Sequence, residues 1–217
     1  MKYLSLFILL FTCSFLIAQQ QATTKVSGPR TYAGAQLPDS EEARMFDAAF
    51  PEKEVGLLHV YADEEVQPSE NYLLEGVEIG SGITNLLPGG YRRLAAREGT
   101  TAYAAGAIRG DDENLYLVRM ASPTDDRIEL FAFRGDRVKL IKTLAYRKCR
   151  SGRCAQLDSY ILDINRDGLL DVAQLIRKRP GMEPQRRAYL MSDTGKLRKD
   201  NSVDVPWDSM ELYEGEK

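Results

Sequence analysis

Side chains with hard oxygen donors are concentrated in one short segment of the chain. Asp163, Asn165 and Asp167 stand at alternate positions, and a further carboxylate follows at Asp171. Gly168 occupies the sixth place, where a glycine lets the backbone turn sharply. In proteins Ca²⁺ takes six or more oxygen ligands from carboxylates, amides, backbone carbonyls and water. The segment therefore predicts a calcium site formed by Asp163, Asn165, Asp167, the backbone carbonyl of Leu169 and Asp171.

This loop differs from an EF-hand in its twelfth position and in its flanks. The twelfth residue is Gln174, so the bidentate glutamate of an EF-hand is missing, and the flanking residues are typical of strands. The order Asp-x-Asn-x-Asp-Gly-x-x-Asp between strands resembles the calcium loops of the FG-GAP and VCBS repeat families. Those families occur in β-propellers and bacterial surface proteins, and there the ninth position, here Asp171, replaces the twelfth. The resemblance covers only the loop and its flanks, and it implies a structural ion, not a switch.

The same residues also fit a plain turn. Asp and Asn side chains are common in turns because they accept hydrogen bonds from nearby backbone amides. An Asx-rich hairpin without metal therefore stays open as the alternative.

No catalytic constellation stands out elsewhere. His59 is the single histidine and lies in an apolar run, so we expect a core histidine, and a multi-histidine zinc site is impossible. No Gly-x-Ser-x-Gly nucleophile elbow is present. The 32 acidic residues leave a carboxylate pair of the glycosidase type open, although nothing marks out one pair. Trp207 fits a buried aromatic better than a sugar-stacking platform. We therefore assign no catalytic residues.

The N-terminus indicates export. Met1-Lys2, an apolar run and the small residue Ala18 have the order of a secretory signal peptide, residues 1–18, and 19–38 reads as a flexible leader. Its ending, Phe-Leu-Ile-Ala-Gln, resembles signal peptides common in Bacteroidetes-type bacteria, which implies a secreted or periplasmic protein. A lipid anchor on Cys13 is the alternative, which Thr12 and the apolar residues after Cys13 disfavour.

Cysteines and charge limit the possible partners. In an oxidising compartment Cys149 and Cys154 predict a disulfide at a hairpin tip. Removing residues 1–18 takes away one lysine, so 28 basic residues face 32 acidic ones and the formal charge becomes −4. The charges are well mixed along the chain, so we expect neither nucleic acid nor a membrane surface as partner, and no later segment is apolar enough to span a bilayer.

The remaining chain predicts a single β-rich domain over residues 39–210 with a frayed tail, 211–217. Ser40 and the acidic residues after it start one short helix that Pro51 ends. Apolar β-branched runs then predict strands at 55–61, 72–79, 100–108, 115–120, 127–133, 138–144, 159–162, 171–176 and 187–191, with a turn at 86–90. The clearest hairpin turns at Gly135-Asp136. Residues 103–144 and 160–200 share a layout that suggests a duplicated unit. The fold class is mainly β, an antiparallel meander forming a sandwich, a barrel or a few propeller-like blades.

These features favour a secreted, non-catalytic β domain with a structural calcium ion that binds a protein or glycan at the cell envelope. The alternatives are an envelope hydrolase that uses paired carboxylates and a structural domain without metal.

Overall fold

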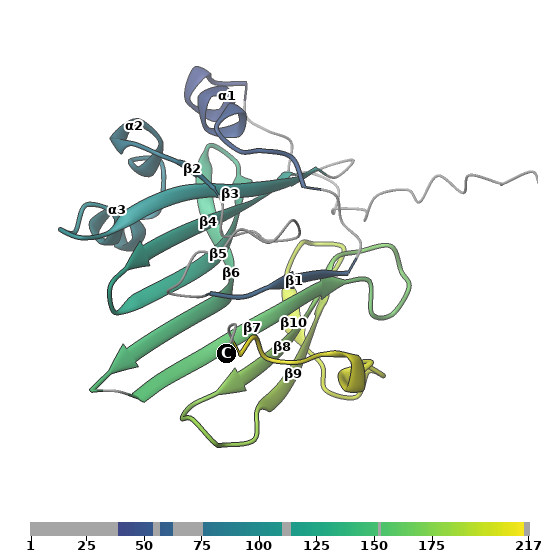
Figure 1. Ribbon diagram of the computed structural model, residues 1–217. Coiled ribbons are helices and arrows are strands. Elements are labelled where there is room, and N and C mark those ends of the chain that lie inside the picture. The colour runs from purple at the N-terminus through teal and green to yellow at the C-terminus, as the bar shows by residue number, and fades with distance from the viewer. Residues whose placement is uncertain (1–38, 54–56, 63–75, 110–113, 152, 215–217) are drawn as a thin grey trace, which may run out of the picture.

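The computed structural model describes residues 39–53, 57–62, 76–109, 114–151 and 153–214. These residues form a mainly β structure built on one antiparallel meander (Figure 1), which confirms the predicted fold class. The expected signal peptide and leader, residues 1–38, lie outside the described residues. No helix in the described part of the chain is long and apolar enough to cross a membrane.

The strands follow one another along the sheet in the order β10-β9-β8-β7-β6-β5-β4-β3-β2. The described strands are β1 (Leu58–Val60), β2 (Val77–Glu78), β3 (Thr101–Arg109), β4 (Asn114–Ser122), β5 (Asp125–Arg134), β6 (Arg137–Arg150), β7 (Arg153–Leu162), β8 (Asp171–Arg177), β9 (Gln185–Met191) and β10 (Leu197–Lys199). The described helices are α1 (Glu41–Ala48), α2 (Ser81–Thr84), α3 (Gly89–Ala95) and the 3-10 helix η1 (Trp207–Ser209).

Strand β1 interrupts this simple order. β7 pairs with β6 only over its first half, from Arg153 to Leu157. Beyond that point the two strands diverge, and β1 lies against the second half of β7, with His59 opposite Tyr160 (Figure 1). The sheet is thus divided into a β2–β6 arm and a β7–β10 arm, with β1 on the second arm.

The two arms enclose a central apolar core. Along β4, Leu115 and Leu117 face this core, while the alternate residues Tyr116 and Val118 face the helices. This is the two-residue period of a strand that is buried on both faces. The central core also receives Leu170 from the loop before β8 and side chains from other strands of both arms, namely Val60, Ile108, Ile128, Leu130, Leu144, Ile161 and Val172.

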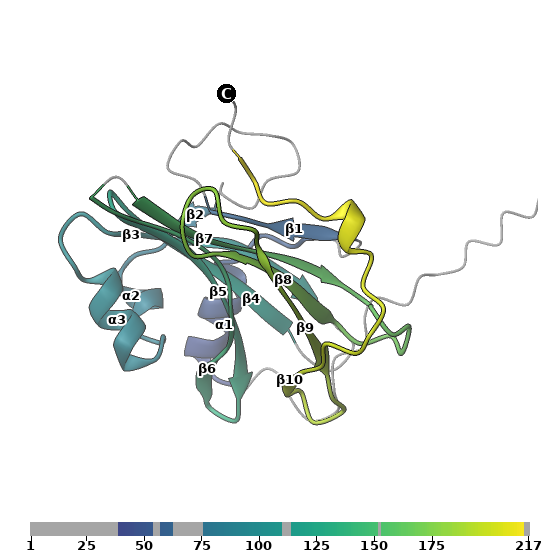
Figure 2. The same ribbon diagram turned by 90° about the horizontal axis from the view of Figure 1, so that it is seen from below.

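Helix α1 covers the outer face of the β2–β6 arm (Figure 2). Ser40 caps it as predicted, because its side chain accepts a hydrogen bond from the Ala43 amide at 3.1 Å. Phe46 is fully buried, and its ring centroid lies 5.1 Å from that of Tyr116 and 5.5 Å from that of Phe133. The predicted N-terminal helix is therefore confirmed.

Helices α2 and α3 stand where the sequence predicts a strand end and a turn over 86–90. Pro88 takes an extended conformation at the start of α3, and Gly89 and Gly90 form its first turn. Tyr91 and Leu94 then pack against the same core as α1, and Tyr91 meets Phe131 edge to face at 5.2 Å. Tertiary burial thus outweighs the weak helix propensity of the two glycines.

The C-terminal segment covers the outer face of the β7–β10 arm, opposite the helices (Figure 2). Val205, Met210 and Leu212 pack on this face with Tyr160 and Leu175 as a third core. Residues 211–214 are therefore not frayed. Leu212 is buried, and the Tyr213 amide donates a hydrogen bond to Oδ2 of Asp158 at 2.6 Å. Residues 215–217 lie outside the described part.

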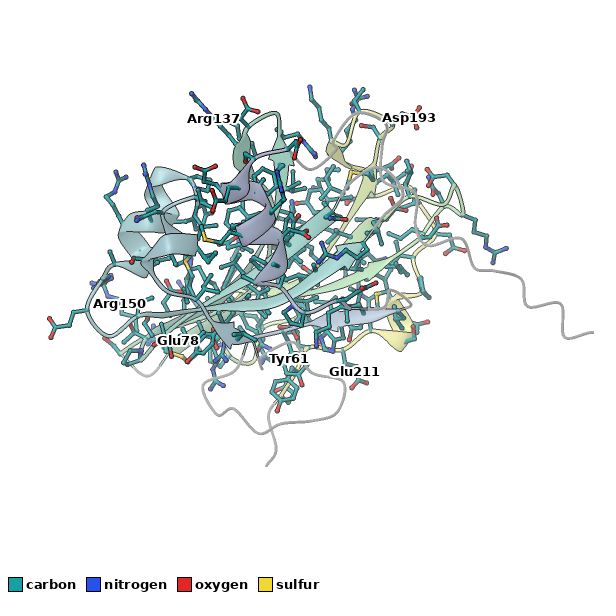
Figure 3. The ribbon with its side chains drawn as sticks, turned by 90° about the horizontal axis from the view of Figure 1, so that it is seen from above. Tyr61, Glu78, Arg137, Arg150, Asp193 and Glu211 are labelled. Carbon is teal, nitrogen blue, oxygen red and sulfur yellow. A yellow bond between two sulfur atoms is a disulfide. The ribbon has the colours of Figure 1, made fainter. Side chains whose placement is uncertain are left out.

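The predicted hairpins close as expected. Gly135, at φ +59°, turns β5 into β6, and Gly195, at φ +69°, lies in the turn between β9 and β10. These two tips, marked by Arg137 and Asp193 in Figure 3, are neighbours, since the Arg134 guanidinium donates to the Gly195 carbonyl at 3.4 Å.

The two segments of the suggested duplication are both antiparallel hairpins, β3–β4 and β7–β8. With an offset of 57 residues, Gly106 and Ile108 align with Asp163 and Asn165, but the aligned positions lie in different parts of the two hairpins. Gly106 and Ile108 are inside β3, whereas Asp163 and Asn165 follow the end of β7. Packing explains the glycine, because a Cβ at Gly106 would lie 2.5 Å from Cγ of Lys53, whose backbone runs beside β3 there.

Candidate functional site

The segment singled out for calcium forms the loop between β7 and β8. Leu162 and Asp171 are a paired position at the base of the β7–β8 hairpin, so the residues between them close a compact turn. Gly168 has φ +84°, which agrees with the sharp bend expected there, and Arg166 also has a positive φ of 62°. Leu169 and Leu170 are buried and anchor the loop beneath its exposed tip.

The three exposed ligand candidates gather around the backbone of the loop. The Asp167 amide lies between Asp163 Oδ1, at 3.1 Å, and Asn165 Oδ1, at 3.2 Å. Asp163 Oδ2 accepts from the Gly168 amide at 2.9 Å, and Asp167 Oδ2 accepts from Asn165 Nδ2 at 2.8 Å. The structure therefore brings Asp163, Asn165 and Asp167 together on one turn.

Asp171 behaves differently because it is fully buried. Its Oδ2 accepts from the Ile164 amide at 2.9 Å, and its Oδ1 accepts from the Met191 amide at 2.8 Å. Burial raises the pKa of this carboxyl, the two amide hydrogen bonds oppose that rise, and the nearby charge of Asp167 adds to it. Asp171 thus ties the loop to the end of β9.

The donor chemistry of the loop fits Ca²⁺, although the geometry is that of a hydrogen-bonded turn. Within the described residues, no three histidine, cysteine, aspartate or glutamate side chains come together as metal ligands. The carboxylates instead accept hydrogen bonds from backbone amides, as the Asx-turn alternative predicts. Each carboxylate oxygen has two lone-pair sites, so an oxygen bonded to one amide still has a site for an ion.

The predicted disulfide is confirmed. Cys149 and Cys154 are directly opposite each other where β6 turns into β7, and their sulfur atoms are bonded. The pair is therefore a structural link at a hairpin tip, and neither thiol is free for metal binding or catalysis.

His59 lies at the rim of a pocket and is not a fully buried core residue. Its ring stacks on Tyr160 at 4.2 Å, and Nε2 lies 3.2 Å from Oδ2 of the fully buried Asp158. The pocket has a volume of about 470 Å³ and also receives Ser209 and Glu211. The Ser209 hydroxyl donates to the Pro206 carbonyl, and in the described part of the chain no hydroxyl or thiol is hydrogen-bonded to His59.

This histidine belongs to a network that holds the C-terminal segment on β7. Asp158 accepts from the Tyr213 amide at 2.6 Å, and Gln156 donates to the Tyr213 carbonyl at 2.6 Å. The Tyr160 hydroxyl donates to the Glu211 carbonyl at 2.7 Å. The His59–Asp158 pair therefore helps to hold the C-terminal segment on β7, and no described serine completes a Ser-His-Asp triad with it.

Trp207 begins η1 and is half-buried against the third core, in agreement with the buried-aromatic expectation. The Arg186 guanidinium lies 5.8 Å from its ring centroid.

Sequence reasoning missed a group of basic residues that the two arms of the sheet bring together. Although charge is mixed over the whole chain, residues 137–157 contain no Asp or Glu. The lack of acidic residues in this stretch is the sequence feature that indicates a local excess of positive charge. The structure places Lys142 of this stretch beside Arg187 and Tyr189 of β9.

Comparison with known proteins adds no relative to these observations: no protein-family model, no curated protein and no solved structure matches the chain.

Proposed function

We propose that this chain is a secreted or periplasmic, non-catalytic β domain whose 163–171 loop binds a structural calcium ion, and that the domain binds a protein or glycan at the cell envelope. The main support is that the Asp167 amide donates to both Asp163 Oδ1 and Asn165 Oδ1, which brings these two oxygens close together on the turn. An ion at this place would meet Asp163, Asn165, Asp167, the Leu169 carbonyl and Asp171.

Charge and anchoring both support a structural ion. Asp163, Asp167 and Asp171 supply three formal negative charges against the two positive charges of Ca²⁺. Because the base of the loop is fixed by buried Leu169, Leu170 and Asp171, the ion would stabilise a loop that is already shaped. Calcium at ten times its dissociation constant would add about 1.4 kcal/mol to the free energy of unfolding.

Calcium titration of the mature domain, residues 19–217, tests this function. We expect Ca²⁺ to raise the melting temperature of the wild type, and EDTA to reverse the rise. Asp167→Ala should abolish the calcium effect, because it removes an exposed ligand. Asp193→Ala is the matched control, since Asp193 is an exposed residue in the β9–β10 turn. Absence of both binding heat and thermal stabilisation in the wild type would show that the loop is a plain turn.

A binding role is supported over the hydrolase alternative by the state of the carboxylates in the His59 pocket. Asp208, Glu211 and Glu214 are exposed there, and Glu214 is paired with Arg177 at 2.6 Å. A general acid usually needs a carboxyl that is buried or close to a second one. Assay against peptidoglycan and polysaccharides checks this alternative, and turnover that one Asp or Glu substitution abolishes would favour the enzyme.

A further inference from the structure

A small basic pocket lies where the two arms of the sheet separate. It has a volume of about 320 Å³ and lies on the inner side of the β7–β10 arm, beside the end of the central core. Strands β6, β7, β8 and β9 and the residue that follows β8 supply its lining, which consists of Lys142, Thr143, Tyr146, Leu157, Gln174, Ile176, Lys178, Arg187 and Tyr189. This size fits a single sugar ring or a similar small molecule, at the lower end of ligand pockets.

We call this cavity the basic pocket. The charged side chains that line it are all positive. Lys142, Lys178 and Arg187 line it, and no Asp or Glu does. Among the described residues no carboxylate forms an ion pair with any of these three cations. Lys142 and Arg187 are half-buried, whereas Lys178 is exposed. Half-buried cations are normally paired, because removing an isolated charge from water is costly. The pocket therefore has an uncompensated positive charge.

Lys142 is the cation that this arrangement affects most. Its ammonium lies 3.2 Å from the ring centroid of Tyr189. Burial lowers the pKa of Lys142, hydrogen bonding to Tyr189 opposes this, and the positive charge of Arg187 lowers it further. Although burial favours the neutral phenol, hydrogen bonding and charge from Lys142 and Arg187 lower the pKa of Tyr189. The shifts of both groups thus reflect burial together with the close approach of Lys142, Tyr189 and Arg187 to one another.

The rest of the lining is fixed and suited to a small organic ligand. The Gln174 amide donates to the Thr143 carbonyl at 2.9 Å and to the Ser159 hydroxyl at 2.8 Å, which holds β8 against β6. Leu157 and Ile176 supply apolar surface, and Tyr146 and Tyr189 supply rings next to the cations. Cations beside aromatic rings suit a ligand that has an anionic group on a ring.

We propose that the basic pocket binds the oxyanion group (carboxylate, sulfate or phosphate) of a small ligand about the size of one sugar ring. Arg187 would contact the oxyanion through two N–H groups and Lys142 through one. The inference deepens the proposed binding function by naming the chemistry of the partner. It does not depend on the calcium loop, so the two can fail separately.

Calorimetric titration of the mature domain at low salt tests the site, with glucuronate, glucose 6-sulfate, inorganic sulfate and inorganic phosphate as probes and glucose as the neutral probe. We expect at least one anion to bind and glucose not to bind. Arg187→Gln and Lys142→Met should each weaken that binding about tenfold or more, as expected for a lost charge-assisted hydrogen bond. Binding of the sugar acids alone would assign the site to a saccharide, and binding of the inorganic anions as well would assign it to the oxyanion group itself.

Matched controls separate the site from general charge effects. Lys139→Met removes an exposed lysine from the same strand, and Arg186→Gln removes the neighbouring arginine, which lies outside the pocket lining. Both should bind like the wild type, and circular dichroism should show all four variants folded. Equal weakening in the controls, or no binding by any anion, would overturn the proposal. A phenolate absorbance at neutral pH that Tyr189→Phe removes would also overturn it, because the pocket would then be neutralised from within.

Discussion

Glu129 is a buried carboxyl that the fold tolerates at a cost. Its residue exposure is 1%, and Oε2 has no hydrogen-bond partner. The Arg127 guanidinium approaches Oε1 only to 3.8 Å. Burial raises the pKa of Glu129 to about 7, while Thr143 and Arg127 oppose the rise. Below about pH 7 the protonated form of Glu129 is therefore favoured in the folded state.

The raised pKa of Glu129 should make the wild-type protein less stable as the pH rises, and Glu129→Gln should remove this loss. Between pH 4.5, the ordinary pKa, and pH 7 the folded chain holds a proton that the unfolded chain has lost, so the free energy of unfolding falls as pH rises. The difference amounts to about 3 kcal/mol at most. Urea unfolding should show the variant gaining stability over wild type from about pH 4 to about pH 8. Glu183→Gln, at an exposed site, should follow the wild type, and a gap independent of pH would contradict the assignment.

At the scale of elements, helix α1 depends on its packing against the sheet for its stability. It has only Glu41–Ala48, too few residues to be stable alone, so its packing on the sheet must hold it. Ala43, Phe46 and Phe50 provide that packing, and Phe46 lies against three other aromatic rings.

Phe46→Ala should therefore lower the free energy of unfolding by about 3–5 kcal/mol, the range for a buried aromatic residue. Met45→Ala is the matched control, because Met45 is 46% exposed on the same helix, and it should cost well under 1 kcal/mol. Chemical unfolding of the two variants measures the difference. Similar losses in both would show that α1 is not packed as described.

The elements also show which parts of the fold a sequence can predict. Ser40 and Phe46 predict α1, Gly135 predicts the β5–β6 turn, and Cys149 with Cys154 predicts the linked tip, because each signal lies within a few residues. The position of β1 has no local signal, since His59 pairs with Tyr160 far along the chain. The basic pocket is hidden for the same reason: Lys142 and Arg187 meet only after the arms fold together. The spacing of Asp163, Asn165 and Asp167 predicts a turn from local sequence alone, but the hydrogen bond that Asp171 accepts from the Met191 amide joins distant segments and has no local signal.

At the scale of the whole molecule, β7 connects the layers. One face of β7 contributes Ile161 to the central core and the other contributes Tyr160 to the third core. β7 also borders the calcium loop at Leu162 and the disulfide at Cys154. A ligand in the basic pocket would contact Leu157 of the same strand. The 163–171 loop and the basic pocket thus both adjoin β7, so the two proposed binding sites share one strand as support.

Asp158 on this strand contacts both β1 and the C-terminal segment. Its carboxylate meets His59 from β1 and the Tyr213 amide from the C-terminal segment, and the rings of Tyr61 and Tyr213 stack at 3.9 Å. Figure 3 shows Tyr61 and Glu211 on the same side of the molecule. The Asp158 carboxylate therefore links β1 to the C-terminal segment, so we expect the loss of one contact to loosen the other.

We expect this shared attachment to make β1 and the C-terminal segment one cooperative unit in local opening. In Asp158→Asn the amide hydrogens of β1 and of residues 211–214 should exchange with solvent about tenfold faster or more, by a similar factor in both segments. Amides of the β5–β6 hairpin should keep their protection, and Asp193→Asn should change neither group. Faster exchange in only one segment would show that the ends open independently. If they open together, β1 is fully held on β7 only while residues 211–214 also lie there, so a partner that displaced the C-terminal segment would release β1 as well.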